Sequence, residues 1–138
     1  MVRPCSYSWI LTWLDERFRL DLSGCTAVTC LIDENLKLYV ANVGDSRIIM
    51  STNGEAHAIS IDHKPSNEVE QQRIVNAGGY VEAGRVNGNL ALSRAFGDLE
   101  FKKNAQLPPA AQAVTVDPEL FELSLSEQDD LLVLACDG

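Results

Sequence analysis

Cysteine is scarce in this sequence, and no two cysteines have the spacing of a zinc site. The four are Cys5, Cys25, Cys30 and Cys136, no pair is separated by two residues, and both histidines lie far from them. The last three lie in or beside apolar runs, which predicts small buried side chains in a reducing compartment. We therefore expect a cytoplasmic or nuclear protein.

Positive charge and long apolar runs are also lacking. The 11 Lys and Arg residues against 20 Asp and Glu residues give a formal net charge of −9, which weighs against a nucleic-acid binder. An anionic substrate would need bound cations to invert the local field. No run reaches the length of a transmembrane helix, and residues 8–14 are followed at once by charges, without a signal-peptide cleavage site. We expect a monomer that binds neither nucleic acid nor a membrane.

The 138 residues hold the composition of one globular domain, with 46% hydrophobic and 22% charged residues. Residues 1–22 differ from the rest, because Ile10, Trp13, Leu14 and Phe18 recur at helical spacing. One amphipathic helix is predicted there. It either packs on the domain or binds a partner, and the pattern leaves both alternatives open.

From Thr26 the pattern is that of β-strands. The run from Thr26 to Ile32 is apolar and β-branched, which is typical of a strand buried on both faces. Residues 37–43 alternate and should pair back on it as a hairpin. Further strands are predicted over residues 48–50, 56–61, 121–125 and 131–135.

One helix and one hairpin separate these strands. Asn67, with Glu70 three residues on, has the pattern of a capping box, and Gly78-Gly79 should end a helix that runs to about Ala77. Asn87-Gly88 favours a type I′ turn between strands 80–86 and 89–93. The polar connection over residues 99–113 is long enough to be functional or disordered.

Three aspartates, Asp45, Asp98 and Asp137, share one context. Each follows an apolar strand and has a glycine beside it. Carboxylates that converge from neighbouring strand ends repel one another unless a cation lies between them. Oxygen ligands select hard ions such as Mg²⁺ or Mn²⁺. The alternative is that each aspartate caps a turn, as Asp-Gly and Gly-Asp pairs often do.

Seven short motifs carry a family resemblance. In their order and approximate spacing they resemble the metal-dependent protein phosphatase 2C family over residues 23–138. The motifs are Thr26-Ala27-Val28, Val43-Gly44-Asp45-Ser46-Arg47, Asp62-His63-Lys64-Pro65, Asn76-Ala77-Gly78-Gly79, Arg85-Val86-Asn87-Gly88, Leu92-Ser93-Arg94-Ala95-Phe96-Gly97-Asp98 and Ala135-Cys136-Asp137-Gly138.

The resemblance implies an α+β fold, in which an antiparallel β-sandwich is flanked by helices in four layers. It implies hydrolysis of phosphoserine and phosphothreonine in proteins by a water that two Mn²⁺ or Mg²⁺ ions bridge. By the same resemblance Asp137 is a ligand of the metal centre and Asp45 belongs to a further, weaker metal site. Asp98 lies near the site, and Arg85 contributes electrostatics near the substrate. Residues 99–113 correspond to the flap, which shapes substrate access.

The departures from the family pattern are also informative. The early Asp-Gly-His-Gly motif is absent from this sequence, as is the final Asp-Asn motif, and residues 1–22 match no family motif. No catalytic residue is therefore assigned. We expect an incomplete sandwich with open sheet edges and weak or no turnover. The alternative is a non-catalytic remnant that acts as a protein-binding module, through the helix of residues 8–20 or through the flap.

Overall fold

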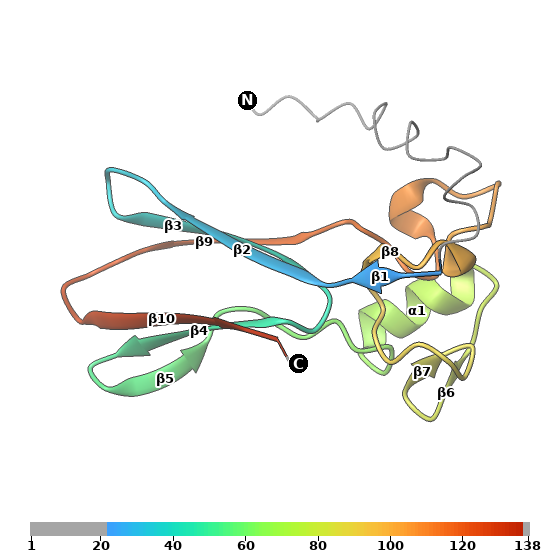
Figure 1. The fold of residues 1–138 in the computed structure, drawn as a ribbon, viewed down its shortest axis with the longest axis horizontal. Helices are drawn as coiled ribbons and strands as arrows, with labels where there is room; N and C mark the ends of the chain where they lie inside the picture. Colours follow the sequence, from blue (N-terminus) through green and yellow to red (C-terminus); the bar gives the residue numbers. More distant parts are fainter. Residues whose placement is uncertain (1–21, 137–138) are drawn as a thin grey trace.

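A computed structural model describes residues 22–136, which form antiparallel sheets with few helices (Figure 1). The predicted amphipathic helix over residues 1–22 and the predicted metal ligand Asp137 lie outside these residues, apart from Leu22. No helix in the described part of the chain is long and apolar enough to cross a membrane.

The first sheet has the order β2-β3-β9, from Ala27–Ile32, Lys37–Val43 and Glu119–Ser124. It contains the predicted hairpin, with Ala27 opposite Val43 and Ile32 opposite Leu38. Leu38 and Val40 are buried while Tyr39 is exposed, so the alternation read from the sequence is confirmed in the central strand.

The second sheet has the order β10-β4-β5, from Asp129–Ala135, Arg47–Thr52 and Glu55–Ala58. Its centre, Ile48, is buried in one cluster with Leu38 and Val40 of the first sheet. Phe121, Leu123 and Leu132 pack around that cluster. Residues 44–46 carry the chain from β3 to β4, and therefore from one sheet to the other.

A second cluster lies beside the sheets, around α1, Glu68–Asn76 (Figure 1). Ile74 of α1 packs there with Val86, Phe101 and Val114. Three pairs of short elements surround it. They are the strands β6 and β7 (Val81–Glu82 and Arg85–Val86), the strands β1 and β8 (Gly24–Cys25 and Phe96–Gly97), and the 3-10 helices Leu99–Phe101 and Pro109–Ala111.

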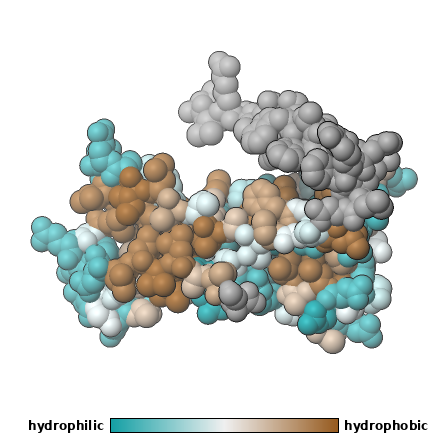
Figure 2. Space-filling view, in the orientation of Figure 1, coloured by the Kyte–Doolittle hydropathy of each residue, from teal (hydrophilic) through white to brown (hydrophobic). Residues whose placement is uncertain are grey.

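The predicted burial of β2 is wrong. Its last four residues, Thr29–Ile32, are exposed, because β2 is an edge strand of its sheet. β10 is also an edge strand and largely exposed. Figure 2 shows the resulting apolar surface over the sheets. Cys25, Cys30 and Cys136 are exposed free thiols, which corrects the prediction that they are buried.

Local details around the helix also differ from the predictions. The turn of the short hairpin is at Ala83-Gly84, between β6 and β7. Residues 89–93 form no strand, although Leu90 makes one bridge to Val86. Asn87 and Gly88 do adopt the positive φ values expected of them, 50° and 75°. The polar flap is packed, because Phe101 and Ala113 are buried in the second cluster.

Candidate functional site

The crossing Gly44-Asp45-Ser46 holds the best-placed candidate residue. Asp45 has a side chain that is 17% exposed, and its carboxylate accepts a hydrogen bond from Nζ of Lys64. Ser46 Oγ lies 2.6 Å from Oγ1 of Thr26. The glycine that precedes Asp45 has φ +107°, a conformation that favours glycine. Asp45 is thus carried on a tightly fixed turn between the two sheets.

A second acid, Asp62, lies in the segment that follows β5. It is bound to Arg47, the first residue of β4. Nε and Nη2 of Arg47 donate to its two carboxylate oxygens at 3.0 and 2.8 Å. These hydrogen bonds lower the pKa of Asp62 below its usual value, against the smaller opposite effect of burial. Both acids at this end of β4 are therefore paired with cations of the chain.

Behind the crossing lies a buried ionic network centred on Glu70. Its side chain is 3% exposed and forms ion pairs with Arg94 at 2.7 Å and Arg73 at 2.8 Å. Ser93 Oγ donates to the same carboxylate at 2.5 Å. Burial alone would raise the pKa of Glu70, but the hydrogen bonds from Arg94, Arg73 and Ser93 together lower it to about 2. The carboxylate is thus held charged in the interior.

Asp98 lies at the start of the flap, as the residue before the 3-10 helix Leu99–Phe101. It is 8% exposed with φ +48°, and its carboxylate packs against Gly24, where an added Cβ would fall 1.9 Å from Oδ2. Burial raises the pKa of Asp98, an effect that the ammonium of Lys102 opposes. The burial of the Lys102 ammonium in turn lowers the pKa of Lys102 to about 8. No hydrogen bond or ion pair among the described residues joins Asp98 to Asp45.

Of the two remaining candidates, only Arg85 lies within residues 22–136. Arg85 is exposed in β7, where its Nη1 donates to the Asn89 carbonyl at 2.6 Å. Asp137 lies outside the described residues. The strand that precedes it does reach the crossing, because β10 ends with Ala135 opposite Arg47, the first residue of β4.

The described residues do not by themselves complete a metal centre. They contain no group of three or more His, Cys, Asp or Glu side chains that could hold an ion. Asp45 fits as a single ligand, because carboxylate oxygens are hard donors and the crossing holds this one rigidly. Its present partner, the ammonium of Lys64, is itself a cation.

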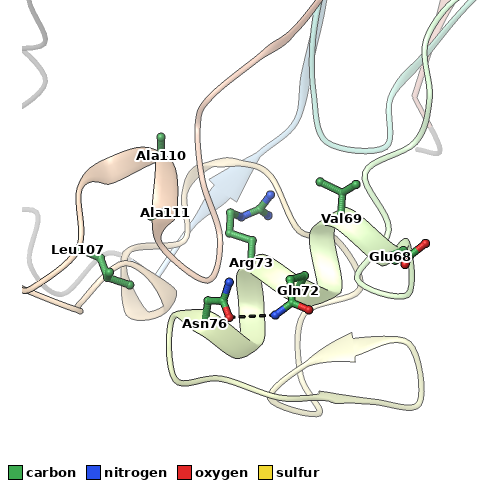
Figure 3. Close-up of a pocket in the computed structure, with 8 residues that line it drawn as sticks. All are labelled: Glu68, Val69, Gln72, Arg73, Asn76, Leu107, Ala110 and Ala111. Atoms are coloured by element: carbon green, nitrogen blue, oxygen red, sulfur yellow. Dashed lines mark hydrogen bonds between the residues drawn. The ribbon is translucent and has the colours of Figure 1, made fainter.

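A groove of about 550 Å³ opens elsewhere, between α1 and flap residues 107–111 (Figure 3). Val69, Leu107 and Ala110 supply apolar walls. The cation that lines it, Arg73, is already bound to Glu70 and to backbone carbonyls of Ser93 and Gln112. The one cation of the lining is therefore engaged, and the exposed carboxylate of Glu68 is the other charged group of the groove.

The buried network around Glu70 was not predicted from the sequence. His63, Ser93 and Arg94 stood within motifs used only for the resemblance, and Glu70 was interpreted as part of a capping box. The Asn67 side chain makes no cap to the helix. The one signal in the sequence for this buried ionic network was that charged residues lie in short motifs on either side of a predicted helix.

The comparisons with known proteins agree with one another. The protein phosphatase 2C homolog 2 of Hypocrea jecorina is 55% identical over 124 residues, which are 90% of this chain and 28% of that protein. A solved phosphatase from a pathogenic strain of Toxoplasma gondii matches at 46% identity with a TM-score of 0.64, over 73% of this chain and 31% of that one.

A structure described as a C. elegans sex determining protein matches with a TM-score of 0.72 at 34% identity, over 91% of this chain and 31% of that one. The chain thus spans less than a third of the length of each of these three proteins. The model of the family described as protein phosphatase 2C matches residues 10–138. This chain belongs to the protein phosphatase 2C family.

Proposed function

We propose that the chain carries a metal-ligating section of a protein serine/threonine phosphatase, which hydrolyses phosphoserine and phosphothreonine in other proteins. Family membership supports this activity. The observation that carries the proposal is the position of Asp45, on a rigid crossing beside the end of β10. Two further residues along the chain from Ala135 lead to Asp137.

The proposed ligands of Mn²⁺ or Mg²⁺ are Asp45 and Asp137. When bound, the ions would supply an activated water and neutralise charge on the phosphoryl group. The chain's own part is to hold the carboxylate of Asp45 in place and to release it from Lys64 as the cation enters. We place Asp98 near the site and assign to Arg85 an electrostatic effect on the anionic substrate.

For the fold, the finer proposal is an antiparallel β-sandwich between helices, in four layers. The support is the cluster in which Leu38 and Val40 of one sheet pack with Ile48 of the other. α1 would belong to a flanking layer. We propose a cytoplasmic or nuclear location and a monomeric state, on the grounds of composition given above.

The test is Mn²⁺-dependent phosphate release from a phosphothreonine peptide by the 138-residue chain. We expect slow release that chelation of the metal abolishes and that Asp137→Asn lowers at least about tenfold, since a lost ligand weakens the metal centre. Glu127→Gln, at an exposed position, is the matched control and should not change the rate. Release that survives both chelation and Asp137→Asn would contradict the proposal. A folded chain without any release would favour the protein-binding module.

A further inference from the structure

The crossing between the sheets depends on Gly44, which has no room for a side chain. A Cβ on this residue would lie 2.3 Å from Cγ2 of Thr26 and 3.0 Å from the Arg94 carbonyl oxygen. Its φ of +107° is rarely adopted by other residues. Because Asp45 is the next residue, any shift of the Gly44 backbone moves the carboxylate of Asp45.

One residue, His63, binds both polar backbone groups of Gly44. The Gly44 N–H donates to Nδ1 of the imidazole at 3.0 Å, and the His63 N–H donates to the Gly44 carbonyl at 3.0 Å. Asn42 Nδ2 donates to the same carbonyl at 3.3 Å. The side chain and the backbone of His63, which belong to a different segment of the chain, thus hold the N–H and the carbonyl of Gly44.

His63 is itself held in place by its surroundings. It is 3% exposed, and its carbonyl accepts a hydrogen bond from the Ser93 N–H at 2.9 Å and lies 2.9 Å from Ser93 Oγ. Because Nδ1 accepts the Gly44 N–H, the neutral ring carries its proton on Nε2, which lies 3.4 Å from Oε2 of Glu119. Burial, together with the nearby Arg94 cation, lowers the pKa of His63 and thus favours this neutral form.

The residue after His63 completes the arrangement. Lys64 binds the Asp45 carboxylate, so that His63 holds the backbone before Asp45 while Lys64 holds its side chain. Lys64 is a mobile cation on a flexible stem and can be exchanged for another cation. The imidazole clamp, in contrast, is buried and does not depend on what binds Asp45.

We propose that His63 is a positioning residue for Asp45: through its clamp on Gly44 it holds the Asp45 carboxylate where a divalent cation binds. The cation in this statement rests on the proposed function, whereas the clamp itself is independent of it. Residues that orient a ligand in this way contribute about ten- to a hundredfold to metal affinity.

The test compares two variants of similar shape, His63→Asn and His63→Leu. Asparagine can place its Oδ1 near the position of Nδ1 and accept the Gly44 N–H, whereas leucine cannot. We expect Gly44 amide exchange, measured by NMR, to stay close to wild type in His63→Asn and to be at least about tenfold faster in His63→Leu. Mn²⁺ broadening of the Asp45 resonances should require about tenfold more metal in His63→Leu.

Ile74→Val is the control, because Ile74 is buried in the other cluster, which includes neither His63 nor Gly44. It should lower the melting temperature without changing either readout. Wild-type values of both readouts in His63→Leu would overturn the proposal.

If His63→Leu fails to fold, the ¹⁵N chemical shifts of the wild-type imidazole test the proposal instead. A ring protonated on Nδ1 would contradict the clamp, because Nδ1 could then not accept the Gly44 N–H. Absence of Mn²⁺ broadening in the wild type would overturn the metal site of the proposed function, while the exchange difference would still support the clamp.

Discussion

At the scale of single residues, Glu70 is a buried charge satisfied from several directions. Arg94, Arg73 and Ser93 all donate to its carboxylate, which is 3% exposed. Removing one partner of a buried ion pair leaves the others unpaired and costs about 3–5 kcal/mol. We therefore expect Glu70→Gln to lower the free energy of unfolding in urea by about that amount. The exposed Glu127→Gln should change it by less than about 0.5 kcal/mol, and equal effects would contradict this account.

The same carboxylate gives the stability a defined acid dependence. Its pKa falls from the usual 4.5 to about 2 on folding. Because the pKa is lower in the folded state, the stabilisation is complete above about pH 4.5 and is lost as the pH falls toward 2. The shift corresponds to about 3 kcal/mol. Urea midpoints measured between pH 7 and pH 2.5 should therefore fall more steeply in wild type than in Glu70→Gln, and parallel curves would refute the assignment.

Two glycines with positive φ allow the energetic cost of backbone strain to be distinguished from the cost of steric crowding. Gly44 has φ +107° and contacts Thr26, whereas Gly54 has φ +80° and nothing within 4 Å of an added Cβ. Alanine at either position bears the cost of a left-handed conformation, about 1–2 kcal/mol. At Gly44 it also meets Thr26, which adds about 1–3 kcal/mol. Denaturant unfolding should show a larger loss for Gly44→Ala than for Gly54→Ala, and a reversed order would be inconsistent with the packing of the crossing.

Sequence alone could place Asp45 at a strand end, because an apolar alternating run stops just before it. It could not identify Lys64 as its partner, since that contact joins residues 19 positions apart and depends on how the strands cross. For the same reason Glu70 was assigned to a local cap. Local spacing cannot distinguish a cap from an ion pair with Arg94, which is 24 positions away.

At the scale of elements, alternation was sufficient to find the strands but not their burial. β3 and β9 were predicted within a few residues, because polar and apolar side chains alternate in both. β2 and β10 are apolar runs, which predict burial only when neighbours cover both faces. Both are edge strands here, so Leu31 and Leu131 are 65% and 60% exposed.

The monomer proposed above has exposed edge strands, which should let the isolated chain self-associate as its concentration rises. β10 presents Leu131, Val133 and Leu134 to solvent, and an open apolar edge pairs readily with other chains. A lysine at such an edge opposes this pairing, so we expect Val133→Lys to shift the weight-average mass toward the monomer in sedimentation velocity. Gln128→Lys adds the same charge in the preceding turn and is the control. Equal effects of the two variants would show that the added charge, and not its position on the edge strand, opposes association.

At the scale of the whole molecule, the formal net charge of −9 opposes the compact state by self-repulsion. Salt screens this repulsion, so the melting temperature should rise by a few degrees, roughly 1 kcal/mol, between 10 and 200 mM NaCl. The double variant Glu55→Lys and Glu127→Lys replaces two exposed acids by lysines. Each substitution raises the formal charge by two, so the net charge changes from −9 to −5. Its melting temperature should depend less on salt. An unchanged salt dependence would show that repulsion is not limiting.

The pairing of the central strands also has a consequence for synthesis on the ribosome. β3 and β4 each receive one neighbour from nearby sequence, but their second neighbours, β9 and β10, come from residues 119–135. In translation these residues emerge last among those described. Until they arrive, β3 and β4 each have an open edge, while α1 and the flap already have most of their partners. The nascent chain therefore passes through a stage in which one cluster can form before the other, and during that stage its exposed strands are candidates for chaperone binding.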